Sequence, residues 1–194
     1  MTNSLTKQDL LESGIKLITQ FCDLNKIQVP EVDICDSNEP SFGTCAYYRD
    51  SVIKIWPKKC SALGLNGRSW SYPGYTVDRT PYGVLAHELG HHVERAHGPA
   101  GGYFSHLWRP KDPTPLTGYC PNNNEWFAEL FRLYVTNPDL LKNIRPIVHN
   151  LMTGQWIEVV NGSWIDILSD SERHIKAAQN KINKANKANK LKSK

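Results

Sequence analysis

The chain has 194 residues, of which 40% are hydrophobic and 10% aromatic, and its formal net charge is +4 at pH 7. This length and apolar content suffice for one well-packed core, which argues against a disordered chain. The positive charge is local, since residues 176–194 contain seven Lys and no acidic residue, leaving 16 basic and 19 acidic side chains elsewhere. We expect one domain over residues 1–170 and a C-terminal helix with a basic tail over residues 171–194.

The composition also bears on location. No run of about 18 apolar residues occurs, so no membrane-spanning helix is predicted. Residues 1–16 are polar and lack the apolar segment of a signal peptide, so we expect a cytoplasmic protein. An odd number of cysteines without a C-x-x-C pair is typical of reduced thiols, although a disulfide stays open. The cysteines are Cys22, Cys35, Cys45, Cys60 and Cys120.

The N-terminal part predicts one helix and three short strands. Apolar residues recur at helical spacing over residues 5–24, which indicates an amphipathic helix. Alternating residues predict a strand at 32–35 and two more at 44–48 and 52–56, joined as a hairpin. Because Lys54 lies between apolar neighbours, we interpret the last strand as an edge strand. Such a strand either pairs with an extended peptide or is merely shielded by its Lys.

The middle of the chain alternates irregular stretches with helices. Residues 57–80 and 100–123 are expected to be loops, whose aromatic residues could line a cleft or dock on the core. Between them, Thr80 followed by Pro81 is typical of a helix start, and the helix is expected to end near residue 97.

Three further segments complete the chain. A helix is expected over residues 125–135 with Asn124 as its cap, followed by residues 138–153 as two helical pieces or one kinked piece around Pro146. Residues 156–168 fit either a hairpin or a loop docked by its tryptophans. A capping-box pattern then begins a last helix.

The most informative segment is H-E-L-G-H at residues 87–91. On a helix, His87 and His91 lie four residues apart on one face and can ligate a single ion. Glu88 is turned about 100° away, so it does not coordinate but can reach a water on the open side. Zinc with two His and a third ligand lowers the pKa of that water towards about 7, and Glu88 can take its proton. This arrangement favours metal-assisted peptide hydrolysis; the alternative is a surface helix with two solvated histidines.

A zinc site requires a third ligand, and Glu125 is the best candidate. It lies at the N-terminal end of its helix, where a carboxylate is favoured. Ala128 leaves room on the same side for the metal-binding helix. One turn further, Glu129 could accept a hydrogen bond from the far nitrogen of a ligating histidine. An acidic helix face in water is the alternative.

H-E-L-G-H followed by N-E-W-F-A-E-L-F-R resembles the gluzincin branch of the zincin metallopeptidases. It is similar to the lethal factor of anthrax toxin and to small metallopeptidases predicted in phages and prophages, which suggests a phage-encoded protein. The resemblance covers roughly residues 43–141. It implies an α+β, zincin-like fold with an N-terminal helix, a small, twisted, mostly antiparallel sheet, the active-site helix, a glutamate helix and C-terminal helices.

The resemblance also assigns roles to single residues. It implies one zinc ion per chain with Glu125 as the third ligand and Glu129 as the carboxylate that supports a ligand. The tyrosine that stabilises the oxyanion in the lethal-factor type falls on Tyr119, although its spacing from Glu125 departs slightly from the family pattern. His106 is the second candidate for that role.

His97 offers a rival interpretation. It completes H-E-x-x-H-x-x-E-x-x-H, which is close to the metzincin motif with three His ligands, and Met152 could serve as the methionine of its Met-turn. That motif requires a Gly where this chain has Glu94. On an unbroken helix, His97 is turned about 240° from His91 and cannot reach the metal.

The sequence therefore predicts a zinc metallopeptidase that acts on a peptide or protein substrate. Two other hypotheses stay open. The zinc site could hold a non-catalytic module or a partner, and the Lys-rich tail could bind nucleic acid or another polyanion.

Overall fold

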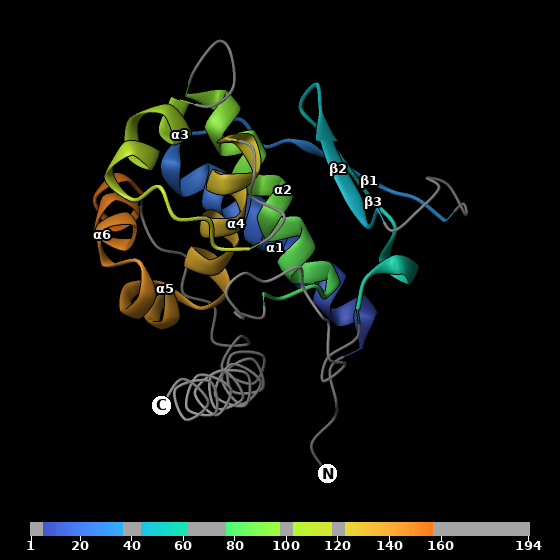
Figure 1. The fold of residues 1–194 in the computed structure, drawn as a ribbon. Helices are drawn as coiled ribbons and strands as arrows, with labels where there is room; N and C mark the ends of the chain where they lie inside the picture. The colour runs from blue at the N-terminus through green and yellow to red at the C-terminus, as the bar shows by residue number, and fades with distance from the viewer. Residues whose placement is uncertain (1–5, 37–43, 62–76, 98–102, 118–122, 157–194) are drawn as a thin grey trace, which may run out of the picture.

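The computed structural model describes five stretches of the protein, namely residues 6–36, 44–61, 77–97, 103–117 and 123–156 (Figure 1). Over these residues the fold is α+β, with six α-helices and a three-stranded mixed sheet, which confirms the predicted class. No helix among them is long and apolar enough to cross a membrane. The predictions on Tyr119, on residues 157–168 and on the basic tail fall outside the described residues.

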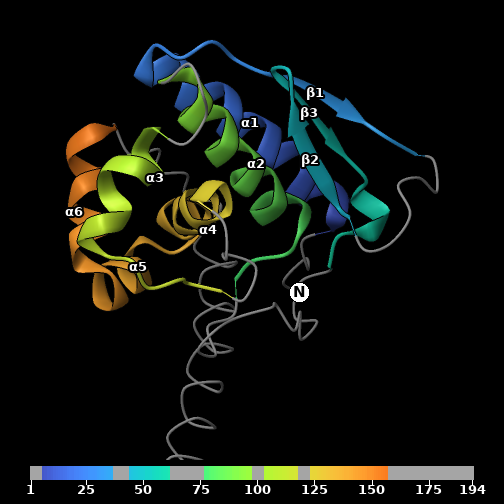
Figure 2. The ribbon, with the colours of Figure 1, turned by 45° about the horizontal axis from the view of Figure 1, so that its top comes forward.

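Helix α2, Pro81–Ala96, is the element that the others surround. Figures 1 and 2 show α1, Lys7–Asn25, alongside α2, with the sheet on one side of α2 and α4, Asn123–Thr136, on the other. Helix α1 begins with a capping box, in which Thr6 accepts from the Asp9 backbone and Asp9 accepts from the Thr6 backbone. The predicted N-terminal helix is thus confirmed to within two residues.

The sheet consists of β1, Glu31–Ile34, β2, Ala46–Arg49, and β3, Val52–Ile55, in the order β1-β3-β2. The hairpin prediction for β2 and β3 is confirmed, and its turn residues Asp50 and Ser51 both have positive φ, as a tight type I′ turn requires. However, β1 pairs with β3 in parallel, so the sheet is mixed and the expected mostly antiparallel sheet is wrong.

The expectation that residues 52–56 form an edge strand is also wrong, because β3 lies between the other two strands. Its Ile53 and Ile55 are fully buried, while Lys54 faces outward and forms an ion pair with Asp33 of β1 at 3.3 Å. An outward Lys therefore reflects a sheet with one face towards solvent, not a sheet edge. Strand β2 is the edge strand that packs against α2.

Residues 103–111 are helical, which corrects the expectation of an irregular stretch. They form α3, Tyr103–Trp108, and the short 3₁₀ helix η2, Arg109–Lys111. Another 3₁₀ helix, η1, spans Pro57–Lys59. Phe104 and Trp108 are four residues apart and both buried. They therefore lie on the same face of α3, and this face packs on the core.

Two helices follow α4, as one of the alternatives for residues 138–153 predicted. They are α5, Pro138–Ile144, and α6, Pro146–Gln155, and Pro146 begins the second. Asn137 ends α4 and caps α5, where its Oδ1 accepts from the Leu140 backbone at 3.0 Å.

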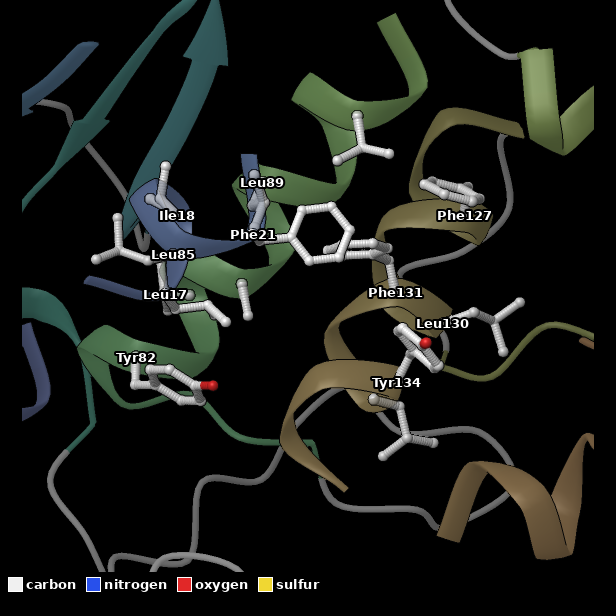
Figure 3. Close-up of a cluster of buried hydrophobic side chains, with 14 of the residues drawn as sticks. Leu17, Ile18, Phe21, Tyr82, Leu85, Leu89, Phe127, Leu130, Phe131 and Tyr134 are labelled. Carbon is white, nitrogen blue, oxygen red and sulfur yellow. The ribbon is translucent and has the colours of Figure 1, made fainter. Parts of the chain in front are cut away.

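The core lies where α1, α2 and α4 meet (Figure 3). Phe21 of α1 meets Phe131 of α4 edge to face, with ring centroids 5.2 Å apart. Trp156 docks on the same aromatic cluster, 5.6 Å from Phe131. The labelled side chains in Figure 3 are Leu17, Ile18, Phe21, Tyr82, Leu85, Leu89, Phe127, Leu130, Phe131 and Tyr134.

Candidate metal centre

The start of α2 fixes where its histidines lie. Thr80 is the N-cap, as predicted, and its hydroxyl accepts from the Gly83 backbone at 3.5 Å. Asp78 in turn accepts from the Thr80 backbone at 2.8 Å. A Cβ on Gly83 would lie only 2.3 Å from the Asp78 carbonyl oxygen, so the segment before the helix folds tightly onto its first turn. The helix therefore enters the core in one defined orientation.

Helix α4 approaches α2 at Gly90. A Cβ built on Gly90 would lie 2.9 Å from Cα of Ala128 and 3.2 Å from Cβ of Phe131, closer than side chains normally tolerate. The sequence predicts that Ala128 leaves room for the metal-binding helix, and the geometry agrees. Because the backbones meet so closely here, the carboxylate of Glu125 reaches the histidines one turn away.

Three side chains converge between these helices. The Nε2 atoms of His87 and His91 are 3.2 Å apart. Glu125 places Oε2 at 3.1 Å from His87 Nε2 and Oε1 at 3.6 Å from His91 Nε2. The three form a group that could hold a metal ion, with one ligand atom from each residue and all of these atoms within 4.8 Å of one another.

These separations fit a zinc site. Nitrogen and oxygen ligands at about 2.0–2.2 Å from a tetrahedral ion lie roughly 3.3–3.5 Å from each other, which is close to the separations found here. Two imidazole nitrogens and a carboxylate oxygen are also a donor set that zinc accepts. The residues present therefore fit the ion that the sequence predicts.

Glu125 is ionised in this setting. Burial raises the pKa of its carboxyl group, but hydrogen bonds and charge interactions with His87 and His91 outweigh burial and lower the pKa to about 2. A carboxylate of this kind is ready to ligate a cation at neutral pH.

Glu129 and Arg132 form a buried network that contacts His87 at its Nδ1 atom. Its Nδ1 atom lies 2.8 Å from Oε1 of Glu129, which is only 1% exposed. Glu129 forms an ion pair with Arg132 one turn further along α4. Arg132 also donates from Nη1 to the backbone carbonyl of Asp78 at 3.2 Å, which ties α4 to the entry of α2. The predicted contact between Glu129 and a histidine is present.

Glu88 follows His87 on α2 and therefore points to another side of the helix. It is 6% exposed, and no hydrogen bond or ion pair within the described residues engages its carboxylate. The side chain is thus buried and is not one of the three converging ligands.

His97 lies apart from the cluster. Its Nδ1 lies 2.8 Å from the Val93 carbonyl, and its ring packs on Phe104 with centroids 5.0 Å apart. Glu94, at the position where the metzincin motif has Gly, accepts from the Ser105 backbone at 2.8 Å and so supports the first turn of α3. The metzincin arrangement is not the one that the structure brings together.

Of the two candidates for stabilising the oxyanion, only His106 lies within the described residues. His106 lies on α3 with an exposed side chain and is not a member of the group formed by the three ligands. Tyr119 lies outside the described residues.

Sequence reasoning missed Arg132 and the role of Glu94. Arg132 follows Glu129 by three residues, which is a spacing that pairs charges on a helix, so one signal was available. Glu94 was considered only as a departure from a motif.

Comparison of the chain with family models, with curated proteins and with solved structures found no match.

Proposed function

We propose that the protein is a zinc-dependent metallopeptidase of the gluzincin type, in which His87, His91 and Glu125 bind one zinc ion per chain. The observation that carries the proposal is the convergence of these three ligand atoms, from two helices, at separations that suit one tetrahedral ion. The H-E-x-x-H motif with its downstream glutamate supports the reaction class.

Zinc bound at such a site lowers the pKa of a coordinated water towards about 7 and polarises a carbonyl oxygen. Glu88 then acts as the general base that accepts a proton from the attacking water, and it can return that proton to the leaving amine. Its burial favours this role, because a carboxylate shielded from bulk water interacts strongly with the reacting atoms.

Glu129 acts by holding a ligand. An imidazole whose Nδ1–H points at a carboxylate presents the lone pair of Nε2 on the opposite side, towards the other ligands. Arg132 pairs with the Glu129 carboxylate and so holds it beside His87, and both side chains are buried. Tyr119 and His106 remain the proposed candidates for stabilising the oxyanion.

The number of ligands favours catalysis over a purely structural site. Among the described residues, the group holds three ligands, whereas structural zinc sites almost always have four protein ligands. A fourth position left to solvent is what hydrolysis requires. The non-catalytic module is therefore the second interpretation, to be separated by experiment.

The test uses the full chain loaded with zinc and a peptide library. We expect Glu88→Gln to keep about one zinc per chain and to lose cleavage by a factor of roughly 10²–10⁴, because general-base catalysis contributes that much. The matched control is Glu31→Gln, exposed at the start of β1, which should cleave as the wild type does. Cleavage retained by Glu88→Gln would contradict its role as base.

A second measurement addresses the open coordination position without a known substrate. A small hydroxamate should bind the zinc-loaded protein and should not bind after zinc is removed by a chelator. If the wild type takes up zinc but not hydroxamate, the site is closed and the non-catalytic module is correct. If the wild type takes up no zinc, the proposal fails altogether.

A further inference from the structure

Two cysteines lie beside each other at the end of the sheet. Cys45 precedes β2, and its carbonyl accepts from the Trp56 backbone at 2.8 Å, one residue beyond the β2–β3 ladder. Cys60 follows η1 directly, and its Sγ lies 3.6 Å from the Trp56 carbonyl oxygen. The Sγ atom of Cys45 lies 3.3 Å from the carbonyl of Lys59, the residue before Cys60. Both sulfur atoms therefore occupy the same small region.

A positive charge lies next to this region. The guanidinium of Arg79 hydrogen-bonds to Cys45, and the backbone carbonyl of Arg79 accepts from the Ser61 backbone at 2.9 Å, beside Cys60. Cys60 is 3% exposed, whereas Cys45 is half-buried. Cys45 is thus the partly exposed cysteine of the pair, and the Arg79 charge lies next to it.

The acidities of the two thiols differ accordingly. A hydrogen bond from Cys60 and the nearby Arg79 and Arg132 charges lower the pKa of Cys45, against the effect of burial. The hydrogen bond to Cys45 and burial raise the pKa of Cys60. Cys45 is therefore the more acidic thiol of the pair and loses its proton before Cys60 does as the pH rises.

The other described cysteines lack these features. Burial raises the pKa of Cys22 to about 12, and Cys22 is fully buried. Burial and the Asp33 carboxylate raise the pKa of Cys35. A more acidic thiol beside a less acidic one is the arrangement that redox-sensitive cysteine pairs use.

We propose that Cys45 and Cys60 form a redox-active dithiol that a small peroxide converts to a disulfide. The Cys45 sulfur attacks one peroxide oxygen, so that an S–O bond forms, the O–O bond breaks, and the leaving hydroxide takes a proton to become water. The Cys60 sulfur then attacks the sulfenic sulfur of Cys45. The S–S bond forms, the S–O bond breaks, and hydroxide leaves with the Cys60 proton as water. The two sulfurs together lose two electrons to the peroxide.

The test exposes the reduced full-length wild type to equimolar hydrogen peroxide, followed by alkylation and peptide mapping. We expect a Cys45–Cys60 linked peptide that a dithiol reductant removes, with Cys22 recovered as the alkylated thiol. Alkylation of Cys45 in the untreated protein should be faster than that of Cys22 and Cys35, with a pH midpoint below that of an ordinary thiol. This result does not depend on zinc or on peptidase activity.

Variants separate the two steps. In Cys60→Ser, the reaction should stop at the sulfenic acid of Cys45, which dimedone traps, whereas Cys35→Ser should give the wild-type yield of disulfide. A Cys45 that alkylates no faster than Cys22, or that links to Cys120 instead, overturns the proposal. Because the mapping on the wild type decides this outcome, it stands even if a variant does not fold.

Discussion

Four histidines lie on or next to one helix, and they divide into two pairs with different surroundings. His87 and His91 face α4, where carboxylates meet their ring nitrogens. His92 faces the other way, with Nδ1 3.2 Å from the Tyr48 hydroxyl and Nε2 2.6 Å from the Gln28 carbonyl. His97 turns back onto its own helix at the Val93 carbonyl. Neighbours on adjoining elements decide what each histidine can do.

The two pairs differ in whether the ring nitrogens named above have a lone pair that a metal can bind. A ring nitrogen that meets a carbonyl oxygen must donate its N–H, so it has no lone pair to give to a metal. The two Nε2 atoms on the α4 side instead point at each other, an arrangement that a shared cation stabilises. Burial lowers the pKa of His92, although its hydrogen bond to Gln28 opposes the shift, and this direction favours the neutral ring.

The largest expected effect that tests this division comes from replacing Glu125, and His97 in a separate variant. Glu125→Ala should lose zinc from the purified protein, because two His ligands on one helix remain without the third ligand. His97→Ala is the matched control and should keep about one zinc per chain, measured by mass spectrometry of the metal. Zinc lost with His97 and kept without Glu125 would instead move the site to the metzincin arrangement.

A smaller loss of zinc affinity is expected when Arg132, which pairs with Glu129, is replaced. Arg132→Met keeps the volume but leaves the buried Glu129 carboxylate without its ion-pair partner, so its hold on His87 weakens. Loss of such a supporting contact typically costs about 10–100-fold in metal affinity. Competition with a zinc chelator measures this loss, and Arg132→Lys should recover part of it. Equal affinity in Arg132→Met and the wild type would show that the network does not position His87.

The sequence predicted the parts of the site that depend on local helical period. The spacing of His87 and His91, and the place of Glu125 at a helix start, follow from one segment each. The contact between Glu129 and a histidine followed once the two helices were assumed to pack. The close approach of the helices at Ala128 was expected for the same reason, since small residues mark where backbones meet.

What the sequence could not supply depends on pairing between distant segments. The central position of β3 is set by β1 binding its far side, and the outward Lys54 looks the same in an edge or a central strand. Helix α3 was missed because its buried Phe104 and Trp108 stand between Gly and Pro residues, which favour loops. The bond from Arg132 to the Asp78 carbonyl joins residues 54 positions apart.

The smallest expected effect concerns the gap that lets α4 approach the histidines. Gly90→Ala adds a methyl group 2.9 Å from Cα of Ala128, so the helices must separate slightly. Overpacking of this kind costs about 1–3 kcal/mol, and we expect the lower part of that range for one methyl group. Gly154→Ala in α6 is the matched control, since nothing lies within 4 Å of its added Cβ. It should gain up to about 1 kcal/mol from helix propensity. Urea unfolding of both zinc-free variants measures the difference. If Gly90→Ala is as stable as Gly154→Ala, the contact of α2 with α4 is looser than these distances require, and the argument that it delivers Glu125 to the histidines fails.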